Sequence, residues 1–125
     1  MKTRVCVWAA AVLLWLMCPA WAAEPASAQL PVAGMVTLVD VGAASCKPCK
    51  MMAPLLEELK GEYQGRAAVV FVDMRFDRQA AERFRLKAIP TQIFFDREGN
   101  EAYRHIGFLD KETMVLMLNK LLAAR

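Results

Sequence analysis

A strong excess of charge of either sign is missing from this sequence. The 125 residues carry 16 Lys and Arg against 13 Asp and Glu, so the formal net charge is only +3. Binding to nucleic acid or to an anionic membrane surface depends on clustered Lys and Arg. We therefore expect neither partner, and the length fits one globular domain with a single core.

The apolar run at the N-terminus is too short to span a membrane. It extends from Val5 to Met17, whereas a helix needs roughly 20 apolar residues to cross a bilayer. A basic start ("MKTR") precedes the run, and Ala20 and Ala22 follow it in the A-x-A spacing that signal peptidase accepts. We predict that residues 1–22 are a cleaved signal peptide and that the protein is exported, with an uncleaved membrane anchor as the less favoured alternative.

Cysteine and histidine are too few for a metal centre. Cleavage after Ala22 would leave two of the four cysteines, Cys46 and Cys49, and the one histidine, His105. A zinc or iron–sulfur site requires about four such ligands, and a stabilising disulfide framework requires more than one pair. We expect no metal, and we interpret His105 as a surface or hairpin residue.

The remaining chain predicts alternating strands and helices. Residues 23–34 are expected to form a linker or N-terminal arm, and residues 35–125 a folded domain. Apolar and β-branched runs predict strands, and helical spacing of apolar residues predicts helices. The strands are expected at 35–42, 67–74, 88–96 and 101–108, and the helices at 47–63, 77–86 and 110–125. This order predicts an α/β fold in which a mixed sheet of about four strands has helices on both faces.

Local signals refine these helices. Asp77 and Asp110 are expected to cap the second and third helices, and Pro54 is expected to bend the first.

Eight methionines raise the alternative of copper binding. Core packing is the better interpretation because several of them fall at helical spacing among leucines. These are Met51, Met52, Met114 and Met117.

The stretch "GAASCKPCKMMAPLLEEL", residues 42–59, places a C-x-x-C pair at the start of the first helix. Asp40 lies six residues before the first cysteine, Pro48 stands between the two, Lys50 follows them, and Ile89-Pro90-Thr91 opens the third strand. In this combination the sequence resembles the thioredoxin family over residues 35–125. The resemblance implies a thioredoxin-like fold and thiol–disulfide exchange.

The two cysteines have different expected tasks. Cys46 should begin the helix, where free backbone N–H groups and the helix dipole favour a thiolate, so we predict that it is the nucleophile. Lys47 adds a positive charge nearby, and Pro48 suits the first helical turn because its missing N–H has no partner there. Cys49, one turn further on, is placed to attack the mixed disulfide.

Further roles follow from the resemblance. Asp40, among apolar strand neighbours, should be buried with a raised pKa, and the resemblance implies that it accepts the proton of Cys49. It also implies that Pro90 is cis and faces the cysteines. The Ile89 backbone, flanking that proline with Thr91, would then pair with an extended substrate.

Some positions depart from the family pattern. Ser45 and Lys47 replace the usual tryptophan and glycine, which alters the docking surface and the redox poise. Phe71 stands where thioredoxins place a lysine near the buried carboxylate.

The sequence therefore predicts a monomeric, periplasmic oxidoreductase that reduces protein disulfides through Cys46 and Cys49 and needs no cofactor beyond that pair. Similarity to small exported bacterial thioredoxin-like proteins implies an inner-membrane electron-relay protein as partner. Two alternatives stay open. One is a binding module with a static disulfide, and the other is an oxidant that forms disulfides.

Overall fold

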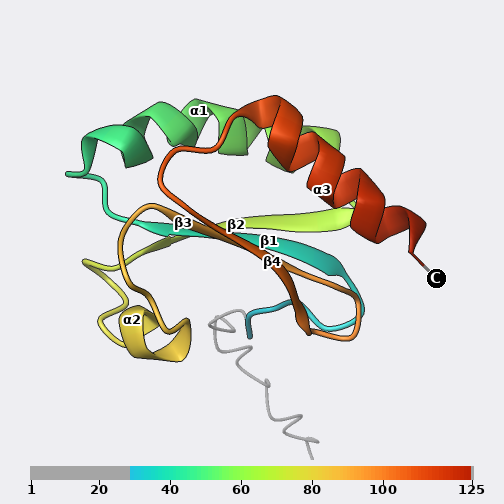
Figure 1. The fold of residues 1–125 in the computed structure, drawn as a ribbon, viewed down its shortest axis with the longest axis horizontal. Helices are drawn as coiled ribbons and strands as arrows, with labels where there is room; N and C mark the ends of the chain where they lie inside the picture. The colour runs from blue at the N-terminus through green and yellow to red at the C-terminus, as the bar shows by residue number, and fades with distance from the viewer. Residues whose placement is uncertain (1–28, 125) are drawn as a thin grey trace, which may run out of the picture.

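The computed structural model of the protein describes residues 29–124. It confirms the predicted order of strands and helices. The elements are β1 (Val36–Gly42), α1 (Lys47–Glu62), β2 (Ala67–Asp73), α2 (Ala80–Arg83), β3 (Thr91–Phe95), β4 (Glu101–Ile106) and α3 (Lys111–Ala123). Helices α1 and α3 cover one face of the sheet and α2 lies on the other (Figure 1). The predicted signal peptide and residues 23–28 of the arm fall outside the described residues.

The sheet is mixed, as predicted, with strand order β2-β1-β3-β4. Strands β1 and β2 are parallel, while β3 is antiparallel to both β1 and β4. Thr91, the first residue of β3, pairs with Val41 on one side and with Ile106 on the other. The start of β3 and the ends of β1 and β4 therefore meet at one end of the sheet, from which the chain enters α1.

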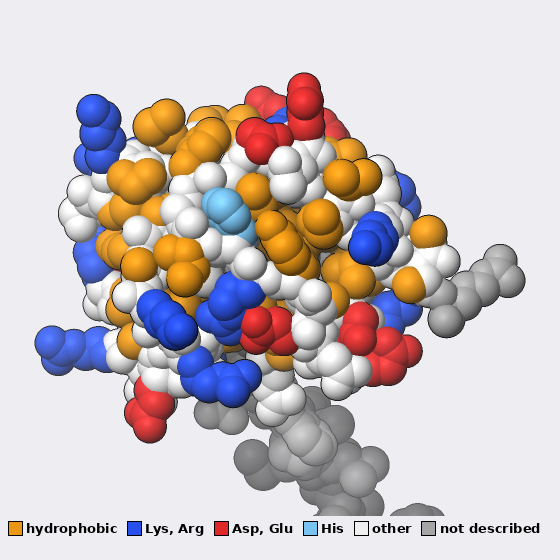
Figure 2. Space-filling view, viewed as in Figure 1, with side chains coloured by type: hydrophobic (Ala, Val, Ile, Leu, Met, Phe, Trp, Pro, Cys, Tyr) orange, Lys and Arg blue, Asp and Glu red, His pale blue; other side chains and the backbone are white. Residues whose placement is uncertain are grey.

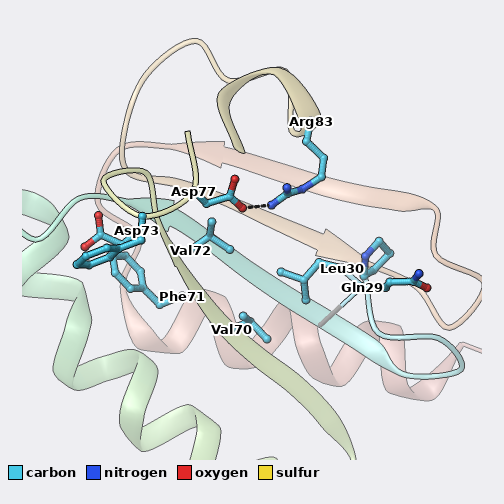
Figure 3. A pocket seen from close by; sticks show the side chains of 10 residues that line it. Gln29, Leu30, Val70, Phe71, Val72, Asp73, Asp77 and Arg83 are labelled. Atoms are coloured by element: carbon cyan, nitrogen blue, oxygen red, sulfur yellow. Dashed lines mark hydrogen bonds and ion pairs between the residues drawn. The ribbon is translucent and has the colours of Figure 1, made fainter. Parts of the chain in front are cut away.

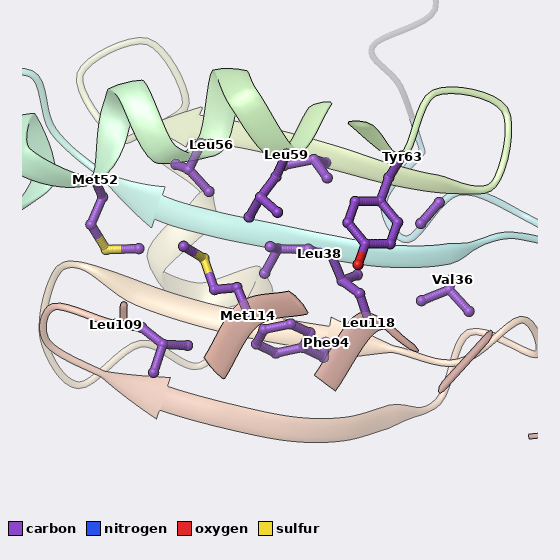
Figure 4. Close-up of a cluster of buried hydrophobic side chains, with 12 residues drawn as sticks. Val36, Leu38, Met52, Leu56, Leu59, Tyr63, Phe94, Leu109, Met114 and Leu118 are labelled. Atoms are coloured by element: carbon purple, nitrogen blue, oxygen red, sulfur yellow. The ribbon is translucent and has the colours of Figure 1, made fainter. Parts of the chain in front are cut away.

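Alternation along the strands builds one hydrophobic core on each face of the sheet. On β1, Leu38 faces the core that α1 and α3 cover, and Val39 faces the core beneath α2. Figure 4 shows the first core, where Leu56 and Leu59 of α1 pack over Leu38 and Phe94. Every residue of β1 is buried, as expected for a central strand covered on both sides.

The two predicted helix caps have different outcomes. Asp110 caps α3, since its Oδ1 accepts a hydrogen bond from the Thr113 N–H at 2.8 Å. The prediction for Asp77 is wrong, because α2 is a single turn that begins after Gln79 and has no side-chain cap. Asp77 instead accepts from the Gln79 N–H in the preceding turn and forms an ion pair with Arg83.

Two further predictions on the elements are corrected. β3 begins at Thr91 rather than at residue 88, since Pro90 has no N–H for a strand ladder and its carbonyl accepts from the Gly107 N–H at 2.8 Å. Met51 is 55% exposed and does not pack in the core. It lies beside the buried stripe of α1, which Met52 joins.

The segment before β1 contacts the domain. Leu30 packs against the core beneath α2, and the Val32 N–H donates to Thr37 Oγ1 at 3.1 Å. Within residues 29–124, no helix is long and apolar enough to cross a membrane.

Candidate active site at the start of α1

The two cysteines form a disulfide at the N-terminus of α1. Cys46 is the N-cap residue, with extended backbone, and its Sγ accepts a hydrogen bond from the Cys49 N–H at 3.3 Å. Cys46 is half-buried, whereas Cys49 is only 3% exposed. The sulfur that solvent and substrates can reach is therefore also the one that receives an N–H from the first helical turn.

The residues around the pair form an accessible rim. Ser45 and Lys47 are exposed, and Pro48 is half-buried in the first turn of α1. Lys50, after the pair, is also exposed. The proline fits this position because an N–H there would have no partner inside the helix.

Gly42, the last residue of β1, lies directly against Cys49. A Cβ built on Gly42 would stand 2.9 Å from Cys49 Sγ and 3.2 Å from Cε2 of Phe71. The approach to the sulfur is closer than a Cβ atom can make, and the approach to the ring is tight, so a larger residue would displace the sulfur and press on the ring. The inner cysteine thus depends on a glycine that the sequence analysis did not single out.

Asp40 is fully buried, on the same face of β1 as Gly42, because alternate strand residues share a face. Burial raises the pKa of its carboxyl from an ordinary value of 3.8 to about 6, and a hydrogen bond from Gln92 partly opposes that rise. Asp40 lies two positions before the glycine that Cys49 contacts. The carboxyl therefore lies on the side of the sheet that holds the inner sulfur.

Gln92 supplies the hydrogen bond to this carboxyl. Its Nε2 donates to Asp40 Oδ1 at 2.7 Å across the β1–β3 pairing. Sequence reasoning missed Gln92, although a polar residue inside the apolar strand "TQIFF" was a usable signal. Phe71, which replaces the expected lysine, is the β2 residue paired with Asp40, as the family pattern implied.

The Ile89-Pro90-Thr91 segment lies at the same end of the sheet. The Ile89–Pro90 peptide bond is cis. Pro90 and Thr91 are buried and Ile89 is half-buried. Thr91 Oγ1 donates to the Ala88 carbonyl at 2.7 Å, which holds the turn that leads into β3. Because Thr91 pairs with Val41, this segment lies next to the end of β1 from which the chain reaches the cysteines.

Comparison with known proteins agrees with this geometry. The thioredoxin family profile matches residues 27–120. A thioredoxin of Staphylococcus haemolyticus is 41% identical over 85 residues, which are 68% of this chain and 81% of that protein. Thioredoxins of Staphylococcus saprophyticus and Staphylococcus aureus are 40% and 39% identical over the same length, with the same coverage. The chain belongs to the thioredoxin family.

The family and the disulfide-forming pair together support thiol–disulfide oxidoreductase activity. Thioredoxins generally act on protein thiols and disulfides, and they need no cofactor beyond the redox-active disulfide. Among residues 29–124 of this thioredoxin-family protein, no three His, Cys, Asp or Glu side chains are grouped so that they could hold a metal ion. His105 lies on β4, where Nε2 is 3.0 Å from the Phe108 carbonyl oxygen.

A groove lies along the edge strand β2 of this thioredoxin-family domain. It has a volume of about 870 Å³, and its walls include Leu30, Val70 and Phe71 (Figure 3). The Asp77–Arg83 ion pair stands at its rim. Figure 2 shows basic, acidic and apolar side chains mixed on one face of the molecule, without a field of a single sign.

Proposed function

We propose that this protein is an exported thiol–disulfide oxidoreductase that reduces protein disulfides through Cys46 and Cys49. The observation that carries the proposal is the asymmetry of the pair. Cys46 is accessible and caps α1, whereas Cys49 is buried on the side of the sheet that also holds Asp40. An attacking thiol needs access and a stabilised thiolate, whereas a resolving thiol needs shielding and a proton acceptor.

The first step is the attack of the Cys46 thiolate on a substrate disulfide. A mixed disulfide forms between Cys46 and one substrate sulfur, and the other sulfur leaves as a thiolate and takes a proton. The helix N-terminus and the Cys49 N–H favour the Cys46 thiolate, because both place positive charge density at Sγ. An extended substrate would lie along the Ile89 backbone, before the strand ladder of β3 begins.

The second step releases the substrate. Cys49 gives its proton to the carboxylate of Asp40, and the resulting thiolate attacks Cys46 Sγ. The Cys46–Cys49 disulfide forms, and the second substrate sulfur leaves with the electron pair of the broken bond. Asp40 suits this role because burial brings its pKa to about 6, close to neutral pH.

The direction of exchange rests on the segment between β2 and β3. Residues 74–90 contain only the four-residue helix α2. They leave no room for the helical insertion that disulfide-forming oxidases use to bind unfolded chains. Reduction of substrates consumes two electrons per turnover, so a dithiol donor must reduce the Cys46–Cys49 disulfide again. We propose an inner-membrane relay protein as that donor.

The decisive experiment is the equilibrium reduction potential of the pair in dithiothreitol or glutathione buffers, read by thiol alkylation and mass. A value near about −270 mV supports a reductant, and a value near about −120 mV would assign an oxidant instead. A pair that never exchanges with these buffers would indicate the static disulfide of a binding module. Export is tested by the N-terminal sequence of the protein from a periplasmic fraction, which we expect to begin at Ala23.

A further inference from the structure

Two buried polar atoms in the described part of the chain lack a hydrogen-bond partner. They are Asp40 Oδ2 and Gln92 Oε1. Both belong to the same pair of residues, which are joined through their other polar atoms. A buried acceptor without a donor is costly, and such atoms are rare in folded proteins. Their occurrence on one pair, on the side of the sheet that holds Cys49, therefore points to a function of the pair.

The amide of Gln92 is held in a defined orientation. Its Nε2 donates one hydrogen to Asp40 Oδ1 at 2.7 Å and the other to Met52 Sδ at 3.0 Å. Gln92 and Asp40 are direct cross-strand partners, and both side chains are fully buried. The carboxyl therefore has one oxygen fixed by the amide and one oxygen free.

The groups that face Asp40 from the neighbouring elements include one histidine, His105 of β4, which pairs with Gln92 and therefore shares the face of Asp40. The residue beside it on β2 is Phe71, and α1 presents Cys49 and Met52 to this side of the sheet. From α3, Met114 and Leu118 enter this core, and Asn119 bonds Tyr63, which lies at the far end of α1. Lys47 and Lys50 of α1 are exposed. The carboxyl thus has Gln92 as its donor, and Cys49 is the buried thiol that α1 brings to the same side of the sheet.

We propose that Gln92 is a positioning residue for the resolving step, because its amide fixes the Asp40 carboxyl through Oδ1 and leaves Oδ2 to take the proton of Cys49. This inference rests on the proposed role of Asp40 as proton acceptor. The proton moves from Cys49 Sγ to Asp40 Oδ2, and the Cys49 thiolate then displaces the substrate sulfur from Cys46 as described above.

An amide suits both protonation states of this carboxyl. While Asp40 is ionised, the Nε2–H group stabilises the carboxylate. Once Asp40 is protonated, its new O–H group needs an acceptor, and the same amide carries one, Oε1, which has no other partner. A lysine at position 92 could stabilise only the ionised Asp40 carboxylate, since an ammonium group has no hydrogen-bond acceptor for the protonated carboxyl.

The test replaces Gln92 with Met, which has a similar shape but no amide, and with Leu as a second apolar variant. The Asp40 carboxyl is titrated by carbon NMR in the oxidised protein, where Cys49 cannot titrate. We expect its pKa to move upward in both variants, because the hydrogen bond to the ionised form is lost. An Asp40 titration that is the same as in the unmodified protein overturns the proposal.

Kinetics give the second readout. We expect Gln92→Met to slow single-turnover reduction of insulin by the reduced protein at pH 7 by roughly threefold to tenfold, and to move the pH profile to higher pH. In an Asp40→Asn background the same substitution should cause no further loss. An equal loss in both backgrounds overturns the proposal, since Gln92 would then act independently of Asp40.

Thr37→Val is the matched control. Thr37 is also a buried polar residue of β1, but it bonds the chain before β1 and lies at the other end of the strand. Its replacement should leave both the Asp40 titration and the pH profile unchanged. If the unmodified protein does not reduce insulin, the proposed function fails, while the Asp40 titration still decides whether Gln92 controls that carboxyl.

Discussion

Gly42 and Cys49 are in closer contact than any other residue type at position 42 would allow. A Cβ at Gly42 would lie 2.9 Å from Cys49 Sγ and 3.3 Å from Cys49 Cβ. The backbone of the central strand at Gly42 is therefore in direct contact with the inner sulfur, Cys49 Sγ. This contact gives Gly42 a role in the site, although glycine has no side chain.

Gly42→Ala is expected to disturb the active site. The added methyl group must push Cys49 or the Phe71 ring away, and overpacking of this kind costs about 1–3 kcal/mol of the free energy of unfolding. Chemical denaturation of the oxidised protein measures this loss. Because the inner sulfur is displaced, the reduction potential should shift as well.

Gly61→Ala is the control for that substitution. Gly61 lies within α1, and nothing stands within 4 Å of a Cβ placed there. Alanine in a helix is favoured over glycine by about 1 kcal/mol, so this variant should be more stable than the unmodified protein. Equal effects of the two substitutions would contradict the close contact at Gly42.

The two cysteines should give distinct variants. Cys46→Ser removes the attacking thiol, so insulin reduction should fall to the uncatalysed rate. Cys49→Ser keeps the attack but lacks the resolving thiol, so mixed disulfides with substrates should accumulate and be visible on non-reducing gels. Full activity of Cys46→Ser, or trapping by that variant instead of the other, would contradict the assigned roles.

Asp40 should lower the stability of the protein at neutral pH. Its folded pKa of about 6 lies above the ordinary 3.8, so the unfolded chain ionises first as the pH rises. Stability is lost between pH 4 and pH 6, by at most about 3 kcal/mol for a shift of this size. We expect Asp40→Asn to stabilise the oxidised protein at pH 7 and to have little effect below pH 4.

The measurement is denaturant unfolding of both proteins at pH 3.5, 5 and 7. The stability difference between them should grow with pH over that interval. A difference that is constant across the three pH values would mean that the Asp40 pKa is the same in the folded and unfolded states.

Tyr63 links α1 to α3 through its hydroxyl, which donates to Asn119 Oδ1 at 2.9 Å. Tyr63→Phe removes this bond while it keeps the ring that is buried in the core. We expect a loss of about 0.5–1.5 kcal/mol in the free energy of unfolding and no change in the rate of disulfide exchange. A slower exchange rate would show that the packing of α3 affects the cysteines.

The order of the elements and the chemistry of the cysteine pair could be predicted from the sequence. Uninterrupted apolar runs predicted buried strands, and the C-x-x-C pair before an amphipathic pattern predicted a redox helix. These signals are local, because they depend on the spacing of residues along one segment. The same reasoning failed at Asp77, whose carboxylate bonds Gln79 and Arg83 within its own segment, and at Met51, which lies beside the buried stripe of α1.

Which residues surround Asp40 and the inner cysteine follows only from the pairing of the strands. Gly42, Gln92 and Phe71 come from three strands, and only the register of the sheet brings them to Asp40 and Cys49. Cross-strand pairing depends on hydrogen bonds between distant segments, and one residue of slippage would turn each side chain to the other face. A glutamine in an apolar strand is a signal in the sequence, but its partner becomes known only when the strands are paired.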